Sequence, residues 1–109
     1  MNFIEHIKDR IQGKAPKGAK RSPEWRKVRK AFAKENPTCY ICAKRSIQVH
    51  HCIPFHVAPD LELEEKNLIS FCPRCHLFVG HNGNFREINT TVKADARYWR
   101  TKFNNHKDD

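Results

Sequence analysis

Hydrophobic side chains recur at helical spacing in the first third of the chain. Residues 3–12 carry four of them on one face, which predicts a short amphipathic helix. A second helix is expected to start at Ser22-Pro23, because serine caps helix N-termini well and proline suits the first helical position. Its end is expected at Asn36-Pro37, since proline disfavours helical geometry in the residue before it. The apolar face of this helix consists of Trp25, Val28 and Phe32.

The apolar stretches that follow are short and are separated by turn residues. Ile47 to Ile53 is typical of a strand that Pro54 ends, and Leu68 to Phe71 is a second stretch of strand length. Pro73 to Val79 suits a short helix that stops at Gly80. A last helix is expected over residues 93–103, and its expected packing residues are Ala96, Tyr98, Trp99 and Phe103.

Two Cys-x-x-Cys pairs lie in the middle of this pattern. They are Cys39-Tyr40-Ile41-Cys42 and Cys72-Pro73-Arg74-Cys75. Each short loop lets two sulfur atoms converge on one tetrahedral ion, which is what a structural zinc site requires. Because the chain is only 109 residues long with a mean hydropathy of -0.80, a large apolar core is not expected. We therefore expect four cysteines, Cys39, Cys42, Cys72 and Cys75, to hold a structural Zn²⁺ that stabilises a small core.

Disulfide bonds are the competing explanation for the cysteines. The total of five is odd, no apolar signal-peptide segment opens the chain, and the spacing is that of metal ligands. Reduced thiolates in a cytoplasmic (intracellular) protein are therefore expected, with no membrane association. Cys52, the fifth cysteine, is expected to be a small buried apolar residue; a redox-sensitive thiol is the alternative.

The positive charge of the chain is concentrated near its start. The formal net charge is +9, and residues 1–34 carry eleven Lys or Arg against three acidic residues. This distribution favours a polyanionic partner such as nucleic acid over a solvated basic tail.

Several motifs together resemble the HNH endonuclease signature. They are Val49-His50-His51-Cys52-Ile53-Pro54, then Asn67-Leu68, then Cys72-Pro73-Arg74-Cys75-His76. The match covers about residues 23–100 and is similar to small phage and prophage HNH proteins, although an aliphatic residue is commoner at the position of Cys52. The resemblance implies a small zinc-stapled α+β domain with a ββα-metal core and flanking helices. It also implies hydrolysis of DNA phosphodiester bonds, with 5′-phosphate and 3′-hydroxyl products, at a catalytic divalent metal (Mg²⁺, Mn²⁺, Ni²⁺ or Zn²⁺).

The resemblance also assigns roles to individual residues. His50 and His76 would bind the catalytic metal, and His51 would be the general base that deprotonates the attacking water. Adjacent strand residues point to opposite faces, which fits separate roles for His50 and His51. Asn67 would hold the loop and orient His51 through hydrogen bonds to backbone, with an ordinary turn residue as the alternative.

A third protein ligand is left open by the sequence. Position 80, where some relatives carry another histidine, is Gly80. His81 lies about 140° around a regular helix from His76, so it would join only if the helix ends at Gly80. His56 is the other candidate, and both histidines are favoured as packing or phosphate contacts. Arg74 is a further candidate phosphate contact, with a solvated arginine as the alternative.

Three functional classes compete. The leading one is an HNH nuclease with a basic N-terminal segment at 1–21, a nuclease domain at 22–103 and a polar tail at 104–109, acting on DNA and associated with phage packaging (terminase) proteins. The second is a catalytically silent, zinc-stabilised DNA-binding module, and the third is a zinc ribbon that binds proteins. Incubation of plasmid with the protein and a divalent ion separates the first two.

Overall fold

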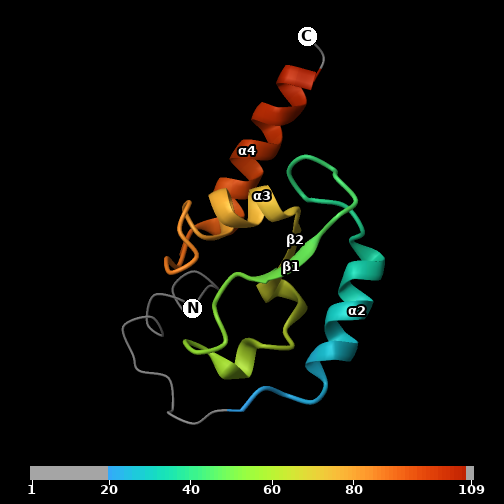
Figure 1. The fold of residues 1–109 in the computed structure, drawn as a ribbon, viewed down its shortest axis with the longest axis vertical. Helices are drawn as coiled ribbons and strands as arrows, with labels where there is room; N and C mark the ends of the chain where they lie inside the picture. Colours follow the sequence, from blue (N-terminus) through green and yellow to red (C-terminus); the bar gives the residue numbers. More distant parts are fainter. Residues whose placement is uncertain (1–19, 108–109) are drawn as a thin grey trace.

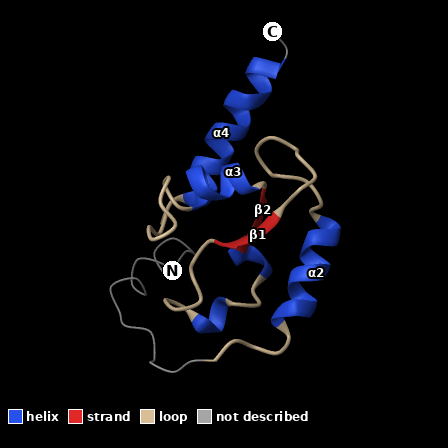
Figure 2. Cartoon of the chain, in the orientation of Figure 1, coloured by secondary structure: helices blue, strands red, loops and turns tan. Residues whose placement is uncertain are grey.

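A two-stranded antiparallel sheet lies at the centre of the computed structural model, which describes residues 20–107 (Figures 1 and 2). Strand β1 (Gln48–His51) pairs with β2 (Leu68–Phe71), and His50 lies opposite Ile69. The second strand has the predicted bounds, while the first is shorter than the predicted 47–53. The helix expected at 3–12, and most of the basic segment at 1–21, lie outside the described residues.

Helix α2 (Trp25–Glu35) packs against β1 and flanks the sheet on the right of Figure 1. The Ser22 hydroxyl accepts a hydrogen bond from the Glu24 backbone N–H at 3.1 Å. The helix ends one residue before Asn36, whose side chain donates to the Phe32 carbonyl at 3.1 Å. The predicted boundaries of this helix were therefore correct to within a few residues.

The connection from β1 to β2 contains two short 3₁₀ helices, η1 (Pro59–Leu61) and η2 (Glu65–Asn67). After β2 the chain forms one turn of α-helix, α3 (Pro73–Cys75), and continues without a break as a π-helix, η3 (His76–Gly80). The segment η3 packs against both β1 and the last helix. It therefore brings residues 76–80 onto the sheet, next to the histidines of β1.

The last helix, α4 (Val92–Lys107), is longer than the predicted 93–103. Val92 and Ala96 are buried in the core that also contains Phe71 and Val79. The expectation that Tyr98, Trp99 and Phe103 pack in this core was wrong, since their side chains are 55%, 51% and 39% exposed. The reason is visible in Figure 1, where α4 projects beyond the sheet and α3.

The main hydrophobic core is built around cysteines as much as around aliphatic residues. Cys39, Cys72 and Cys52 are buried in it, together with Ile69 and Phe71. Burial raises the pKa of the Cys52 thiol to about 11, so this side chain behaves as the small apolar residue that was predicted. No helix in the described part of the chain is long and apolar enough to cross a membrane.

Candidate functional site

Two groups of side chains able to bind a metal ion occur within residues 20–107. One consists of four cysteines, Cys39, Cys42, Cys72 and Cys75, and the other of three histidines, His50, His76 and His81. In each group the potential ligand atoms lie within 4.8 Å of one another. Because η3 follows α3 directly, the second Cys-x-x-Cys pair and His76 belong to one continuous helical segment.

The cysteine group has the dimensions of a tetrahedral zinc site. The Sγ atoms of Cys42 and Cys72 are 3.6 Å apart. Tetrahedral geometry with Zn–S bonds of about 2.3 Å places sulfur atoms roughly 3.8 Å apart, so these two atoms need to separate only slightly to bind one ion. The two knuckles are also fixed by backbone: the Cys39 N–H donates to the Lys44 carbonyl at 2.8 Å, and the Cys75 N–H donates to Cys72 Sγ at 3.5 Å.

Without a cation, these four thiols cannot all ionise. Burial raises the pKa of Cys42 and of Cys75, whose neighbouring thiols raise it further. Burial opposes ionisation of Cys72 as well, but hydrogen bonds from Cys75 and from neighbouring thiols leave its pKa lowered. Four thiolates this close together require a positive charge between them, and a divalent ion such as Zn²⁺ is what would stabilise them.

The three histidines converge from two elements and the residue after η3. His50 projects from β1, His76 begins η3, and His81 follows its last residue. The Nε2 atom of His76 lies 3.0 Å from His50 Nδ1 and 3.2 Å from His81 Nε2. A tetrahedral site with metal–nitrogen bonds of 2.0–2.1 Å places nitrogen atoms about 3.4 Å apart, so the observed spacing suits one ion.

Hydrogen bonds at the Nδ1 atoms of His76 and His81 leave the lone pairs of their Nε2 atoms directed toward the centre of the histidine cluster. Nδ1 of His81 lies 3.0 Å from the Glu87 carbonyl oxygen, which only accepts, so this nitrogen carries the proton. Nδ1 of His76 lies 2.7 Å from Oε1 of Gln48 and donates in the same way. Both Nε2 atoms then present lone pairs to each other at 3.2 Å, an arrangement that a shared cation stabilises.

His50 is the most buried member of the histidine cluster. Its side chain contacts the Phe71 ring, and its Nε2 atom has no hydrogen-bond partner among the described residues. Burial, followed by the neighbouring His76 and His81, lowers the pKa of His50 to about 3. Burial and His81 lower the pKa of His76 to about 4. Both rings are therefore neutral near pH 7, which is the form that binds metal.

The π-helix explains why His81 joins the cluster. In a regular α-helix, residues five apart lie on different faces, but a π-helix closes i to i+5 turns and brings such residues together. The π-helical segment ends at Gly80, and an i to i−4 hydrogen bond from the His81 backbone N–H to the Leu77 carbonyl, at 3.3 Å, follows it. The condition stated for His81 is thus met, and its ring lies 4.8 Å from that of His76, centroid to centroid.

Gly80 lies against two rings of the histidine cluster. A Cβ atom at this position would be 3.1 Å from Cδ2 of His76 and 3.2 Å from Cε1 of His50. We predict that Gly80→Ala displaces these rings and weakens metal binding at the histidines about tenfold, the lower end of what outer-sphere changes cost. Calorimetric titration of the zinc-loaded protein checks this, and unchanged affinity would show that the rings move without effect on binding.

His51 points away from the histidine cluster, as strand alternation predicts. Its Nε2 atom lies 2.9 Å from the Glu62 carbonyl oxygen and therefore donates, which leaves Nδ1 with the free lone pair. Its ring packs on Trp25 of α2, with centroids 4.2 Å apart. Burial lowers the pKa of His51, so the neutral form, which can accept a proton, is favoured near pH 7.

Asn67 fixes the loop that follows β1. Its side chain is fully buried, accepts from the Ile53 N–H at 2.8 Å, and donates to the carbonyls of Ile53 and Leu61, each at 3.1 Å. The backbone carbonyl of Asn67 also accepts from the Cys52 N–H at 2.7 Å. Asn67 thus holds the backbone of the loop that begins after His51 and contains Glu62.

We predict that Asn67→Ala lowers the free energy of unfolding by about 2–4 kcal/mol, because three buried backbone groups lose their partner. Chemical denaturation of the zinc-loaded protein measures this. The exposed Asn84→Ala is the control, and a change below about 1 kcal/mol at Asn67 would contradict the assigned contacts.

Two other residues named from the sequence lie elsewhere. The side chain of His56 is exposed in the loop before η1, and His56 is not a member of the histidine cluster. Arg74 is exposed on α3, with its guanidinium 5.9 Å from the Phe78 ring centroid. It lines a groove beside the cysteines.

Sequence analysis missed several residues that support the site. The buried Glu62 carboxylate accepts from the Ser22 N–H at 2.8 Å and pairs with Arg21 at 3.2 Å, while the Glu62 backbone carbonyl accepts from the His51 ring.

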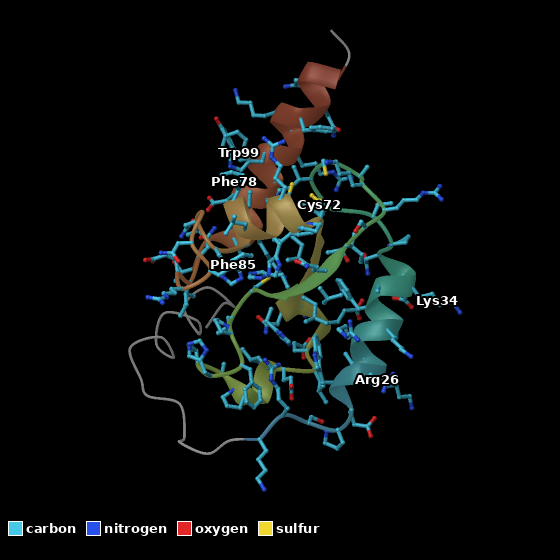
Figure 3. The ribbon with its side chains drawn as sticks, in the orientation of Figure 1. Arg26, Lys34, Cys72, Phe78, Phe85 and Trp99 are labelled. Carbon is cyan, nitrogen blue, oxygen red and sulfur yellow. The ribbon has the colours of Figure 1, made fainter. Side chains whose placement is uncertain are left out.

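Phe85 packs its ring on His81, with centroids 5.1 Å apart (Figure 3 labels Phe85). Asn89 is buried and ties the Val79 carbonyl, at 2.7 Å, to the start of α4.

Part of the chain matches a known protein family. Residues 39–81 match the model of the HNH endonuclease family. Comparison with curated proteins and with solved structures gives no match. The matched segment begins at the first zinc-type cysteine and ends at the last histidine of the cluster. HNH nucleases act on DNA, so the match indicates a nuclease or DNA-binding function. Residues 39–81 are therefore similar to the HNH endonuclease family, the family that the motifs of this segment resemble.

Proposed function

We propose that the chain is a metal-dependent endonuclease that hydrolyses DNA phosphodiester bonds and leaves 5′-phosphate and 3′-hydroxyl ends. The observation that carries the proposal is the meeting of His50, His76 and His81 around one point, beside a fourth histidine held separately. Four thiols suffice to stabilise the fold, so a purely structural domain has no need of this second cluster.

In this proposal, β1, β2 and the α3–η3 segment are the ββα-metal core. His50, His76 and His81 would hold the catalytic ion, and Cys39, Cys42, Cys72 and Cys75 the structural Zn²⁺. The chemistry that a bound divalent ion supplies at such a site is charge neutralisation at the phosphate and stabilisation of the departing oxygen. Oxygen atoms of water and DNA would complete the coordination, since three histidines leave positions open.

His51 is the general base in this proposal. Its Nδ1 lone pair accepts the proton of the attacking water, while its Nε2–H remains bonded to the Glu62 carbonyl. The ring gains a positive charge at that moment, and the carbonyl dipole stabilises it. Asn67 acts as a positioning residue, because it fixes the loop on which that carbonyl lies. The Trp25 ring, tilted by 37° against the His51 ring, packs beside it and helps to hold its position.

The basic segment supports a DNA substrate. Residues 1–34 carry most of the net charge, and exposed cations such as Arg26 and Lys34 lie along α2 (Figure 3). Such contacts position a protein on the phosphate backbone without sequence selection. In the proposal, residues 1–21 form this basic arm, residues 22–103 the nuclease domain, and residues 104–109 a polar tail. The proposal includes an intracellular setting, which free cysteines support. It also includes association with phage packaging (terminase) proteins, for which the support is the family resemblance alone.

Incubation of supercoiled plasmid with zinc-loaded protein tests the proposal. We expect nicked or linear product with Mg²⁺, Mn²⁺, Ni²⁺ or additional Zn²⁺, and none after chelation of the weakly held ion. Salt-sensitive DNA binding without cleavage under any of these ions would instead favour the catalytically silent DNA-binding module.

A further inference from the structure

A groove lined mainly by apolar side chains runs beside the cysteine cluster. Its volume is about 640 Å³, and its floor includes Ile41, Val79 and three of the cysteines. Phe78 of η3 and three aromatic residues of α4 form its walls. None of the clustered histidines lines it, so the groove is separate from the proposed catalytic site.

The walls of this groove are unusually exposed for aromatic residues. Phe78 is 60% exposed, and Trp99 is 51% exposed. Figure 3 labels both residues and shows them near one another, where η3 meets α4. Trp99 and Phe103 are four residues apart, so they lie on one face of α4, along which the groove extends. Contiguous exposed apolar residues of this kind mark an interaction surface.

The charges that line the groove have one sign. Lys44, Arg74 and Lys102 contribute side chains to it, and no acidic residue does. Lys44 belongs to the first knuckle, Arg74 to α3 and Lys102 to α4, so the cations surround the apolar floor. A partner segment that complements this surface would carry an apolar stripe flanked by carboxylates.

Two other occupants fit less well. The first is a single-stranded nucleic acid, whose bases would need free ring faces on which to stack. Cations already lie over two of the rings: Lys102 is 5.6 Å from the Tyr98 ring centroid, and Arg74 is 5.9 Å from that of Phe78. In addition, the Tyr98 and Trp99 rings meet edge-on at 84°. A second copy of the chain would bring the same three cations against each other, in a protein whose net charge is already +9.

We infer that this groove is a docking site for an acidic amphipathic helix of a partner protein. The apolar face of such a helix would lie between Phe78 and the α4 aromatics, and its carboxylates would pair with the surrounding cations. Because the groove is lined by three of the cysteines and by none of the clustered histidines, a docked helix would lie against the cysteine side of the domain.

A synthetic peptide pair tests the inference with the full-length, zinc-loaded protein. The probe is a fluorescein-labelled helix of about 18 residues with leucines at i, i+3, i+4 and i+7 and glutamates elsewhere; its partner has lysines in place of the glutamates. By fluorescence anisotropy we expect the acidic peptide to bind at least tenfold more tightly than the basic one. Trp99→Ala should weaken it tenfold or more, whereas the exposed Leu63→Ala, outside the groove, should not.

Charge reversal sharpens the test. Lys44→Glu combined with Lys102→Glu should reverse the preference, so that the basic peptide binds more tightly. Three outcomes would overturn the inference: equal binding of both peptides, Trp99-dependent binding of oligo(dT) in place of the acidic peptide, or Trp99-dependent self-association in sedimentation. Retention of metal-dependent plasmid cleavage in Trp99→Ala separates failure of this inference from failure of the proposed nuclease function.

Discussion

His51→Ala is expected to reduce DNA cleavage by about 10²- to 10⁴-fold, the range that general-base catalysis contributes. The reason is the separation of roles around β1: the ring of His51 contacts Trp25 and the Glu62 carbonyl, while His50 faces the histidine cluster. Loss of the His51 ring therefore removes the proton acceptor without removing a potential metal ligand. Single-turnover cleavage of a labelled duplex measures the effect.

The same variant provides its own controls. Zinc content, metal affinity of the histidine cluster and DNA affinity should all match the unmodified protein, because none of them depends on His51 Nδ1. A His51→Ala protein that cleaves within about tenfold of the unmodified rate would remove His51 as the general base. Loss of fold or of zinc would instead assign it a structural role through its packing on Trp25.

Cys39→Ser is expected to unfold the domain core. Zinc binding to four cysteines contributes about 10–16 kcal/mol of apparent folding energy, which is comparable to or larger than the stability of a typical domain. Cys39 is 2% exposed and lies in the main core, so its replacement also leaves a hydroxyl without an identified partner in an apolar environment. Circular dichroism and native mass spectrometry should show an unfolded chain that lacks zinc.

Cys52→Ser is the matched control, because Cys52 is also buried in that core but is not a member of the cysteine cluster. This variant should keep its zinc and fold, with a loss of about 1–3 kcal/mol for burying a hydroxyl. A folded, zinc-free Cys39→Ser protein would contradict the assigned zinc site, and equal damage from both substitutions would show that core packing, not metal binding, is decisive.

The parts of the site that depend on local spacing were predictable. The spacing of the two Cys-x-x-Cys pairs is enough to predict a metal site, and short apolar stretches and prolines were enough to predict the approximate positions of the strands and helices. His76 was predictable for the same reason, since it adjoins Cys75. These features require few contacts between residues distant in sequence.

Other features depend on contacts that a sequence pattern does not contain. His81 joins the cluster through a π-helix, whereas periodicity arguments assume a regular α-helix. Trp99 and Phe103 have the spacing of a buried face, but α4 extends past the core, so they stay exposed. The burial of Glu62 depends on Arg21 and on the Ser22 N–H, which are about 40 residues away in the chain.

The most direct test of the account is a count of bound metal ions in two proteins, the unmodified chain and His76→Ala. Both are loaded with zinc at the cysteines and then titrated with Ni²⁺ or Mn²⁺ by calorimetry. We predict that the unmodified protein takes up one further ion per chain and that His76→Ala takes up none at micromolar concentrations, with its first zinc retained. The same number of ions in both proteins would contradict the claim that His50, His76 and His81 form a second, separate metal site.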